Sequence, residues 1–243
     1  MLPQKTYVTK DCVLHESDYD VSKQVKLHRL MEFMQDLATE HAFKLGFGWD
    51  YMDKNGLFWV ISKYKIVFDK PVDRSVRSFK LYTWPIAPNK FFIERRFVAV
   101  NDSGEQLFSA TTIWMIVERD TRKIASQEVI NKFYRADFDD TPCDADTSFE
   151  RIRKDDGYEL SYEREIRRTD LDINRHVNNT NYINFAIDVA DCSKTVKQAE
   201  IVYHKELKLA DCVKVFSKNV NGNALIIGER NGETCFTAKL ILQ

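Results

Sequence analysis

The chain has 243 residues, of which 44% are hydrophobic and 12% aromatic, enough to bury one large core or two smaller ones. Such a composition excludes a disordered chain. The net charge of −1 gives no overall attraction to nucleic acid, and no apolar run approaches the roughly 20 residues that span a bilayer. Five scattered cysteines predict neither a disulfide framework nor a zinc site, and we expect no metal and no cofactor.

The N-terminal residues up to Tyr7 contain neither the apolar segment of a signal peptide nor a transit segment rich in Ser and Arg. Unpaired cysteines are typical of a reducing compartment. Both features together predict a cytoplasmic protein.

The first half of the chain predicts one strand, one long helix and then an antiparallel meander. Residues 7–15 alternate enough for an opening strand. From Leu27 to Leu45, apolar residues recur at three- and four-residue steps without internal Gly or Pro, which predicts an amphipathic helix that ends near Gly46. Runs rich in aromatic and β-branched residues then predict strands over residues 57–68, 76–84, 91–100 and 107–117.

Residues 135–154 differ from the rest of the chain because they are acidic and contain few apolar side chains. Their aspartates gather around Pro142 at positions 137, 139, 140, 144 and 146. This composition predicts a linker between an N-terminal domain, residues 1–134, and a C-terminal domain, residues 155–243. An acidic metal-binding loop is the alternative, but the segment lacks the regular carboxylate spacing and the Gly of a calcium loop.

The second half predicts the same order of elements as the first. Residues 158–168 read as a strand, 179–190 as a helix, and 197–208, 212–220, 224–230 and 234–242 as strands. The pairs Asn221-Gly222 and Asn231-Gly232 are strong signals for hairpin turns. The repeated order predicts an α+β fold that arose by tandem duplication.

A direct alignment of the two halves supports the duplication. With Asp20 placed on Asp172, residues 14–38 align with 166–190 without a gap. The identical pairs are Asp18/Asp170, Asp20/Asp172, Val25/Val177, Phe33/Phe185, Asp36/Asp188 and Ala38/Ala190.

The differences between the copies are informative. In this alignment the first copy has Ser22 at the position of Asn174 and Gln24 at the position of His176. A separate alignment of Asp73 with Asp211 places Phe68 opposite Glu206. The first copy is therefore predicted to have lost an imidazole and a carboxylate while keeping the scaffold.

The most polar of the repeated segments, residues 172–179, reads DINRHVNN and precedes an apolar helical segment. Asn178 and Asn179 suit a helix start, because Asn side chains accept hydrogen bonds from the first turn. The N–H groups of Val177, Asn178 and Asn179 can stabilise a developing oxyanion. Alternatively, the two asparagines only cap the helix and His176 is a hydrogen-bonded turn residue.

This segment resembles the Asp-x-Asn-x-His motif of the acyl-acyl carrier protein (acyl-ACP) thioesterases of plants and bacteria. In that family a catalytic Glu follows on a later strand, and Glu206 takes its position here. The resemblance extends from Lys5 to the C-terminus. It implies a tandem (double) hotdog fold, in which an antiparallel sheet wraps a long central helix in each half. It also implies hydrolysis of fatty acyl-ACP, which releases free fatty acid and ends fatty acid synthesis.

Two departures from the plant members matter. Plant members carry a Cys directly after the Glu, whereas this chain has Leu207, so that no thiolate nucleophile can stand there. The plant proteins are imported into plastids, and the missing transit segment therefore predicts a bacterial member or a trimmed chain.

The resemblance implies a catalytic set of four residues. Glu206 is the first candidate for the general base that activates water, and His176 shares that role or orients the water. Asn174 positions the water or the carbonyl, and Asp172 holds the loop. The sequence does not show which of Glu206 and His176 is the general base. The alternative for Glu206 is an exposed strand carboxylate.

The resemblance also implies a place for the acyl chain and for its carrier. Phe68, Trp59 and Phe33 in the first half are candidates for lining the acyl pocket. Because acyl carrier proteins are acidic, a basic rim is expected near the motif. Its candidate residues, each of which can also be an ordinary surface charge, are Arg164, Arg167, Arg168 and Arg175. A monomer and a homodimer are both open.

Three other functions compete with this interpretation. A hotdog acyl-CoA thioesterase would use the same chemistry on another carrier. A hydratase or dehydratase also uses a His with a carboxylate, but its thioester survives and its Asp/His spacing differs. A non-catalytic acyl-binding sensor would have lost the polar set from both halves, and this chain keeps it in one.

Overall fold

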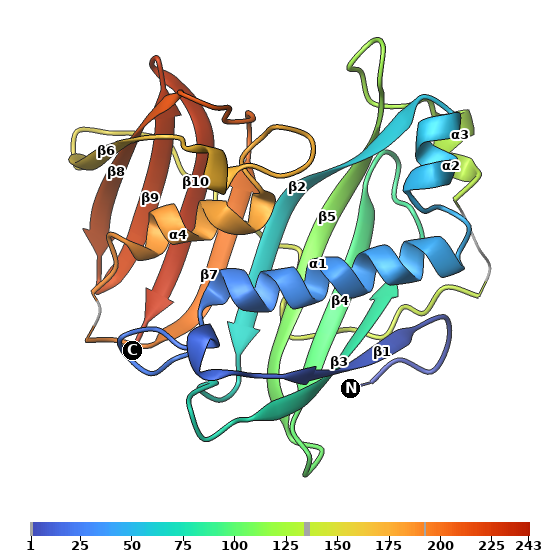
Figure 1. Ribbon diagram of the computed structural model, residues 1–243, viewed down its shortest axis with the longest axis horizontal. Coiled ribbons are helices and arrows are strands. Elements are labelled where there is room, and N and C mark those ends of the chain that lie inside the picture. Colours follow the sequence, from blue (N-terminus) through green and yellow to red (C-terminus); the bar gives the residue numbers. More distant parts are fainter. Residues whose placement is uncertain (1, 134–136, 192) are drawn as a thin grey trace.

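The computed structural model describes residues 2–133, 137–191 and 193–243, and within them ten strands form one continuous antiparallel sheet (Figure 1). The first half contributes β1 (Val8–Val13), β2 (Leu57–Phe68), β3 (Ser78–Pro85), β4 (Ile93–Val100) and β5 (Gln106–Glu118). The second contributes β6 (Glu159–Glu165), β7 (Val196–Tyr203), β8 (Cys212–Val220), β9 (Asn223–Arg230) and β10 (Glu233–Leu242). The order across the sheet is β1-β3-β4-β5-β2-β7-β10-β9-β8-β6, so the halves join where β2 pairs with β7.

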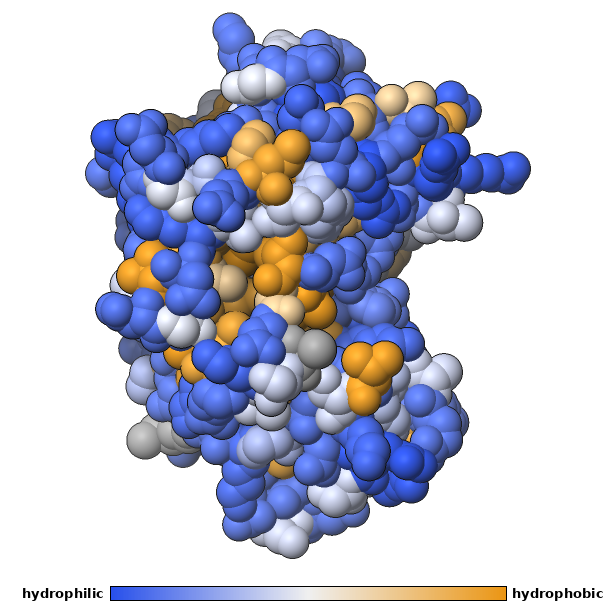
Figure 2. Space-filling view, turned by 90° about the vertical axis from the view of Figure 1, so that its left-hand side faces the viewer, coloured by the Kyte–Doolittle hydropathy of each residue, from blue (hydrophilic) through white to orange (hydrophobic). Residues whose placement is uncertain are grey.

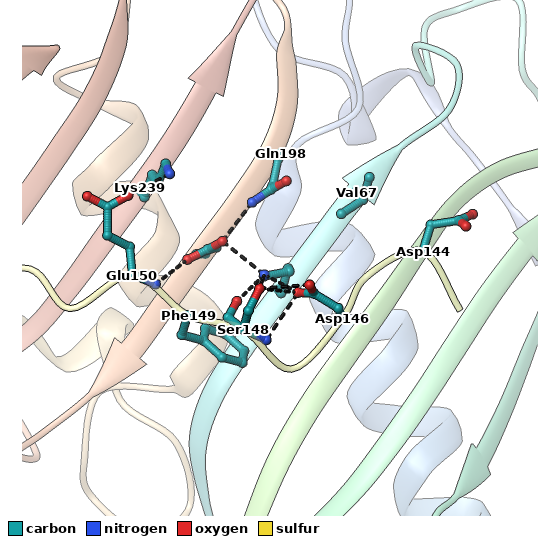
Figure 3. A pocket seen from close by; sticks show the side chains of 10 residues that line it. Val67, Asp144, Asp146, Ser148, Phe149, Glu150, Gln198 and Lys239 are labelled. Atoms are coloured by element: carbon teal, nitrogen blue, oxygen red, sulfur yellow. Dashed lines mark hydrogen bonds and ion pairs between the residues drawn. The ribbon is translucent and has the colours of Figure 1, made fainter. Parts of the chain in front are cut away.

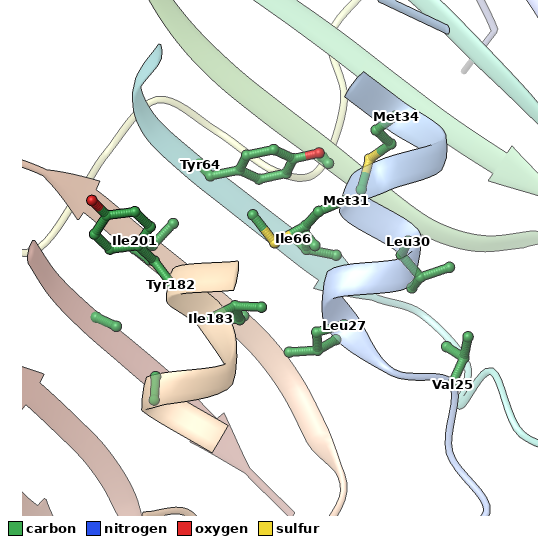
Figure 4. Close-up of a cluster of buried hydrophobic side chains, with 14 of the residues drawn as sticks. Val25, Leu27, Leu30, Met31, Met34, Tyr64, Ile66, Tyr182, Ile183 and Ile201 are labelled. Atoms are coloured by element: carbon green, nitrogen blue, oxygen red, sulfur yellow. The ribbon is translucent and has the colours of Figure 1, made fainter. Parts of the chain in front are cut away.

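One helix of each half lies against the same face of the sheet (Figure 1). In the first half, α1 (Leu27–Lys44) buries its apolar stripe, which includes Leu30, Met31, Met34 and Leu37. In the second half, α4 (Tyr182–Ile187) buries Tyr182, Ile183, Phe185 and Ala186. These stripes meet the inward-facing side chains of β2 and β7 in a single core that spans the junction of the halves (Figure 4). The predicted α+β class is confirmed.

Several short helices complete the fold. The two that sequence periodicity missed are α2 (Trp49–Lys54) and α3 (Gln127–Asn131), which are too short to show a repeating apolar pattern. Single 3₁₀ turns occupy η1 (Glu16–Asp18), η2 (Arg168–Asp170) and η3 (Asn179–Asn181). No helix in the described ranges is both long and apolar enough to cross a membrane.

The second central helix is shorter than the 12 residues predicted for 179–190, because 3₁₀ geometry replaces the α-helix at both ends. Before α4, the turn Asn179–Asn181 is 3₁₀. After it, the N–H groups of Val189 and Ala190 donate to the carbonyls of Ala186 and Ile187, three residues back. Such i→i+3 bonds tighten the last turn of a helix.

The repeat predicted from the sequence is visible in matching backbone hydrogen bonds. In the first copy the Asp20 carboxylate accepts from the N–H groups of Ser22 and Gln24, at 2.8 and 3.0 Å. In the second copy the Asp172 carboxylate accepts from the N–H groups of residues 174 and 176, at 2.8 and 3.3 Å. The two loops therefore have the same internal bonding, and only the outward side chains differ.

The same comparison corrects the predicted counterpart of Glu206. Val25 N–H donates to the Val72 carbonyl, and Val177 N–H donates to the Leu207 carbonyl, each at 2.8 Å. Leu207 is thus equivalent to Val72, and the residue before it, Glu206, is equivalent to Pro71 rather than to Phe68. The alignment of Asp73 with Asp211 was wrong because a short loop carries no periodicity that fixes its register.

A buried ion pair lies where the two halves meet. Lys65 on β2 is directly opposite Glu200 on β7, with Nζ and Oε1 3.1 Å apart, and the two side chains are 5% and 7% exposed. By the register given above, Lys65 and Glu200 occupy equivalent positions in the two copies. Two identical copies would carry the same residue at both positions, whereas here the two positions carry opposite charges that attract each other.

The acidic segment after the first half is held against the sheet by this pair. Residues 137–154 contain neither helix nor strand and run along the sheet face opposite α1 and α4 (Figure 1). The Asp146 carboxylate accepts from Lys65 Nζ at 2.6 Å, and Asp139 accepts from the N–H groups of Gln4 and Lys5 at 2.6 and 2.7 Å. A polar cavity of about 420 Å³ lies between this segment and the sheet (Figure 3). Residues 135 and 136 of the predicted linker lie outside the described residues.

Replacing Lys65 with Met is expected to lower the free energy of unfolding by about 3 kcal/mol, because it leaves the Glu200 carboxylate buried without its partner. The matched control is Lys70→Met, which removes a pair with Glu105 that is about half-exposed on both sides. That change should cost much less, because an exposed ion pair is screened by water and contributes little to stability. Urea unfolding measures both. Equal losses would mean that the Lys65 pair contributes no more than a surface pair.

Candidate functional site

Two loops bring the predicted catalytic imidazole and carboxylate together at the end of β7. His176 Nε2 lies 3.2 Å from Glu206 Oε2, with the side chains 20% and 47% exposed. The loops are joined by a backbone bridge between His176 and Lys208 and by the bond from Val177 N–H to the Leu207 carbonyl. The pair is therefore fixed by main-chain contacts and open to solvent on one side.

Asp172 shapes the loop that carries His176. Its carboxylate accepts from the N–H groups of Asn174 and His176, and the Asn174 side chain donates to it at 3.4 Å. Between them, Arg175 takes a left-handed backbone with φ of 64°. Such a turn is costly for a non-glycine residue unless its surroundings hold it, and here the Asp172 bonds do so. The Asn174 side chain is exposed.

Glu206 does not lie on a strand, contrary to the predicted strand 197–208. β7 ends at Tyr203, because the N–H groups of His204 and Lys205 both donate to the Cys235 carbonyl, at 2.8 and 3.0 Å. Two residues of one strand that oppose a single residue of its neighbour form a β-bulge, which bends the chain away from the sheet. Glu206 is consequently carried by the following turn, where it is half-exposed.

The helix start provides fewer oxyanion donors than the sequence predicted. The N–H of Val177 is used by the Leu207 carbonyl, and the N–H of Asn178 is used by the Asp170 carbonyl at 3.0 Å. Neither group can therefore serve a substrate in this conformation. The Asn178 side chain caps the turn by accepting from the Thr180 N–H and hydroxyl. Asn179 is the first residue of its 3₁₀ turn, so its N–H has no acceptor within the turn. This N–H is therefore the one candidate oxyanion donor that we keep of the three.

Two tyrosines that the sequence did not single out support these loops. The Tyr182 hydroxyl accepts from the Leu207 N–H, and the Tyr203 hydroxyl donates to the Asn179 carbonyl, both at 2.9 Å. Burial raises the pKa of both phenols, so they stay neutral. The position of Tyr182 just after the polar motif was a signal that could have found it.

The acyl-pocket candidates lie in three different places. Phe68 lines a cavity of about 220 Å³ together with Ser22 and Gln24. Phe68 follows the last β2 residue paired with β7, and β7 runs the opposite way, so this cavity is roughly 20 Å from Tyr203 along the strands. Phe33 packs edge-on against Phe79 of β3 in the core of the first half.

Trp59 alone among the three lies at the catalytic end of β2. It packs against Trp114 and Phe133, with ring centroids 6.5 and 5.4 Å apart. Its neighbour Phe58 contacts the Arg122 guanidinium, which in turn lies 4.0 Å from Glu206. Of the three candidates, Trp59 therefore lies at the same end of β2 as Glu206, whereas Phe68 lies at the other end.

The predicted docking arginines are not equivalent. Arg164 pairs with Asp170 at 2.6 Å and lies over the Phe185 ring, and Arg167 pairs with Glu165 at 3.2 Å. Arg168 and Arg175 are exposed. Arg175 lies within the loop that carries His176.

On the side of the second half, the surface carries apolar patches among hydrophilic side chains (Figure 2).

Three of the described cysteines, Cys12, Cys143 and Cys235, do not have the setting of a nucleophile. Cys12 and Cys235 are buried, and burial raises the pKa of both thiols, that of Cys12 to about 12. Cys212 is exposed at the start of β8. Cys192 lies outside the described residues. Nor do three or more His, Cys, Asp or Glu side chains gather as a metal site in the ranges that the structure describes.

Replacing all five cysteines with Ala or Ser is therefore expected to leave thioester hydrolysis within a few-fold of wild type. The check is the rate of thiol release before and after alkylation of the wild-type protein. Stoichiometric inactivation by modification of one thiol, with protection by substrate, would contradict the expectation unless the label blocks the site sterically.

Comparison with known proteins shows the family. The profile of the acyl-ACP thioesterase N-terminal domain matches residues 5–134, and that of the C-terminal domain matches residues 153–240. A palmitoyl-acyl carrier protein thioesterase of Gossypium hirsutum is 26% identical over 84% of this chain and 54% of its own length. An oleoyl-acyl carrier protein thioesterase of Arabidopsis thaliana is 23% identical over 91% and 66%. The chain thus spans about half to two-thirds of these curated relatives.

Solved structures show the same fold. An acyl-ACP thioesterase from Bacteroides thetaiotaomicron superposes with a TM-score of 0.86 at 22% identity, covering 98% of both chains. The 12:0-ACP thioesterase from Umbellularia californica gives 0.82 at 16% identity, covering 99% of this chain and 98% of its own. The predicted tandem hotdog fold is confirmed. With both domain profiles matched across most of its length, the chain belongs to the acyl-ACP thioesterase family.

Proposed function

We propose that this protein hydrolyses the thioester of fatty acyl-ACP, releasing free fatty acid and so ending fatty acid synthesis. The observation that carries the proposal is the contact between His176 Nε2 and Glu206 Oε2, at 3.2 Å on a solvent-accessible edge of the fold. The chain's membership of the family supports the choice of substrate class. Thioester plus water gives carboxylic acid plus thiol, and a thiolate leaves readily without strong acid assistance.

The geometry favours Glu206 as the base. A neutral imidazole facing a carboxylate through Nε2 is attractive only if that nitrogen carries the proton and donates it. In this arrangement Nε2 has no lone pair for a water molecule, whereas the Glu206 carboxylate keeps free acceptor positions. Glu206 then takes the proton of the attacking water while His176 orients the carboxylate, and the protonated Glu206 returns that proton to the departing thiolate.

The other groups take supporting roles in this mechanism. The exposed Asn174 amide positions the water or the carbonyl, while Asp172 holds the loop through the bonds described above. The Asn179 N–H is the candidate donor to the developing oxyanion. Arg168 and Arg175 are the exposed charges that would meet an acidic carrier protein, and Trp59 lines the first part of the acyl chain's path.

The test is one assay series with acyl-ACP, acyl-CoA and enoyl-CoA, in which free thiol and double-bond hydration are followed separately. We expect thiol release, with kcat/KM highest on acyl-ACP. Preference for acyl-CoA would instead support a CoA thioesterase. Hydration without thiol release would support a hydratase, and binding without turnover would support an acyl sensor.

We also propose a bacterial, cytoplasmic setting, supported by the five scattered cysteines, which are typical of a reducing compartment. The curated relatives are named as chloroplastic proteins, and one of the similar solved structures is bacterial. A single chain already contains the paired hotdogs, so both a monomer and a homodimer are compatible with the site.

A further inference from the structure

A turn of the first half extends to the catalytic carboxylate of the second. The turn follows β5 and is closed by bonds from the Arg122 N–H to the Glu118 carbonyl, at 3.0 Å, and from the Glu118 N–H to the Lys123 carbonyl, at 2.9 Å. The Thr121 hydroxyl donates to the Glu118 carboxylate at 2.9 Å. Arg122 itself has φ of 57°, a left-handed conformation that the surrounding bonds hold in place. The backbone that presents this side chain is therefore well defined.

The Arg122 side chain is directed by an aromatic ring and ends at Glu206. Its guanidinium carbon lies 5.2 Å from the centroid of the Phe58 ring, and Nη2 lies 4.0 Å from Glu206 Oε2. His176 contacts that same oxygen at 3.2 Å. One carboxylate oxygen is thus flanked by a cation from the first half and an imidazole from the second.

The contact is too weak to be explained as a device for stability. Arg122 and Glu206 are 57% and 47% exposed, and exposed ion pairs of this kind contribute at most about 1 kcal/mol to folding. A rigid guanidinium, partly preoriented on an aromatic ring, is instead well suited to fix the direction of a carboxylate. The distance of 4.0 Å leaves room for the closer contact that catalytic groups make once a substrate has displaced water.

We propose that Arg122 is a positioning residue for the reaction, through which the first half completes the catalytic site of the second. It holds the Glu206 carboxylate in the orientation from which one oxygen accepts from His176 and the other faces the attacking water. The inference rests on the proposed function, because it assigns Arg122 a role only if Glu206 acts on a thioester. It also explains how the first copy serves catalysis after losing its own imidazole and carboxylate.

Arg119, in the same region, provides a matched control. Its Nη2 pairs with Asp53 at 2.7 Å, and both side chains are more than half exposed. Arg119→Ala therefore removes the same charge from the same edge of the molecule without touching Glu206. Any general effect of positive charge on the approach of an acidic carrier should appear equally in both variants.

The experiment measures kcat and KM on acyl-ACP for Arg122→Ala, Arg122→Lys and Arg119→Ala, each in wild type and in the Glu206→Gln background. We expect Arg122→Ala to lower kcat about tenfold, a loss of about 1.4 kcal/mol in transition-state stabilisation, with KM within about twofold. Arg122→Lys should recover part of that loss, and Arg119→Ala should stay within about twofold of wild type. In the Glu206→Gln background, Arg122→Ala should have no further effect.

Three results would overturn the inference. One is an unchanged kcat in folded Arg122→Ala. Another is a rise in KM alone that disappears at high salt, which would make Arg122 a docking residue. The third is an equal loss with and without Glu206. Failure of the proposed function is a separate result, because wild type would then release no thiol from acyl-ACP. Thermal unfolding of each variant is the check that it is folded.

Discussion

Glu206→Ala is expected to lower kcat on acyl-ACP by at least about two orders of magnitude with little change in KM, since loss of a general base typically costs ~10²–10⁴-fold. The carboxylate is half-exposed beside His176, where it can hold a water molecule but buries little substrate surface. Its contribution is therefore made in the transition state, and binding of the substrate does not depend on it. Steady-state thiol release across a range of acyl-ACP concentrations separates the two constants.

A neighbouring carboxylate provides the control. Glu233 is exposed and pairs with Lys205, the residue just before Glu206, at 2.7 Å. Glu233→Ala should change kcat by less than about twofold, because exposed pairs contribute little and this one does not contact His176. Near wild-type turnover in folded Glu206→Ala would remove Glu206 from the mechanism and leave His176 as the base.

His176→Ala should cost about two orders of magnitude or more in kcat, whereas Gln24→Ala should cost less than about tenfold. The two residues occupy equivalent positions in loops with the same internal hydrogen bonds. The residue that each one meets is different. His176 contacts Glu206, whereas the first copy has Pro71 at the position equivalent to Glu206. Removal of Gln24 therefore breaks no acid–base pair.

The asymmetry is measured as kcat/KM for both variants across a series of acyl-ACP chain lengths. Both changes leave the carboxylates that shape the loops in place, Asp20 in one copy and Asp172 in the other, so each variant is expected to fold. Equal losses would mean that both half-sites work, and the assignment of catalysis to the second copy would have to be abandoned.

One strand, one helix and one loop that are determined by residues close together in the chain were predicted correctly from the sequence. β2 was predicted with both ends correct, because a run of aromatic and β-branched residues lies between the turn at Gly56 and the polar residues that follow Phe68. The 3.6-residue apolar period placed α1 within a residue of its observed end. The loop that carries His176 was identified from its own residues, because the bonds from Asp172 that shape it span only two and four positions.

Features set by distant contacts were not predictable in this way. The end of β7, and with it the place of Glu206 in a turn, is decided by the Cys235 carbonyl on β10. The loss of Val177 and Asn178 as oxyanion donors follows from acceptors on two other loops. The approach of Arg122 to Glu206 depends on the pairing of β2 with β7, which joins residues far apart in the chain.

The most direct test of the account is a double-mutant cycle on the pair that it places at the centre of catalysis. His176 and Glu206 are 3.2 Å apart, and groups that act as one unit show strongly non-additive losses. We predict that His176→Ala/Glu206→Ala loses no more kcat on acyl-ACP than the worse of the two single variants, within about threefold. If the two losses multiply instead, the imidazole and the carboxylate act independently, and the account of a single His–Glu catalytic pair is contradicted.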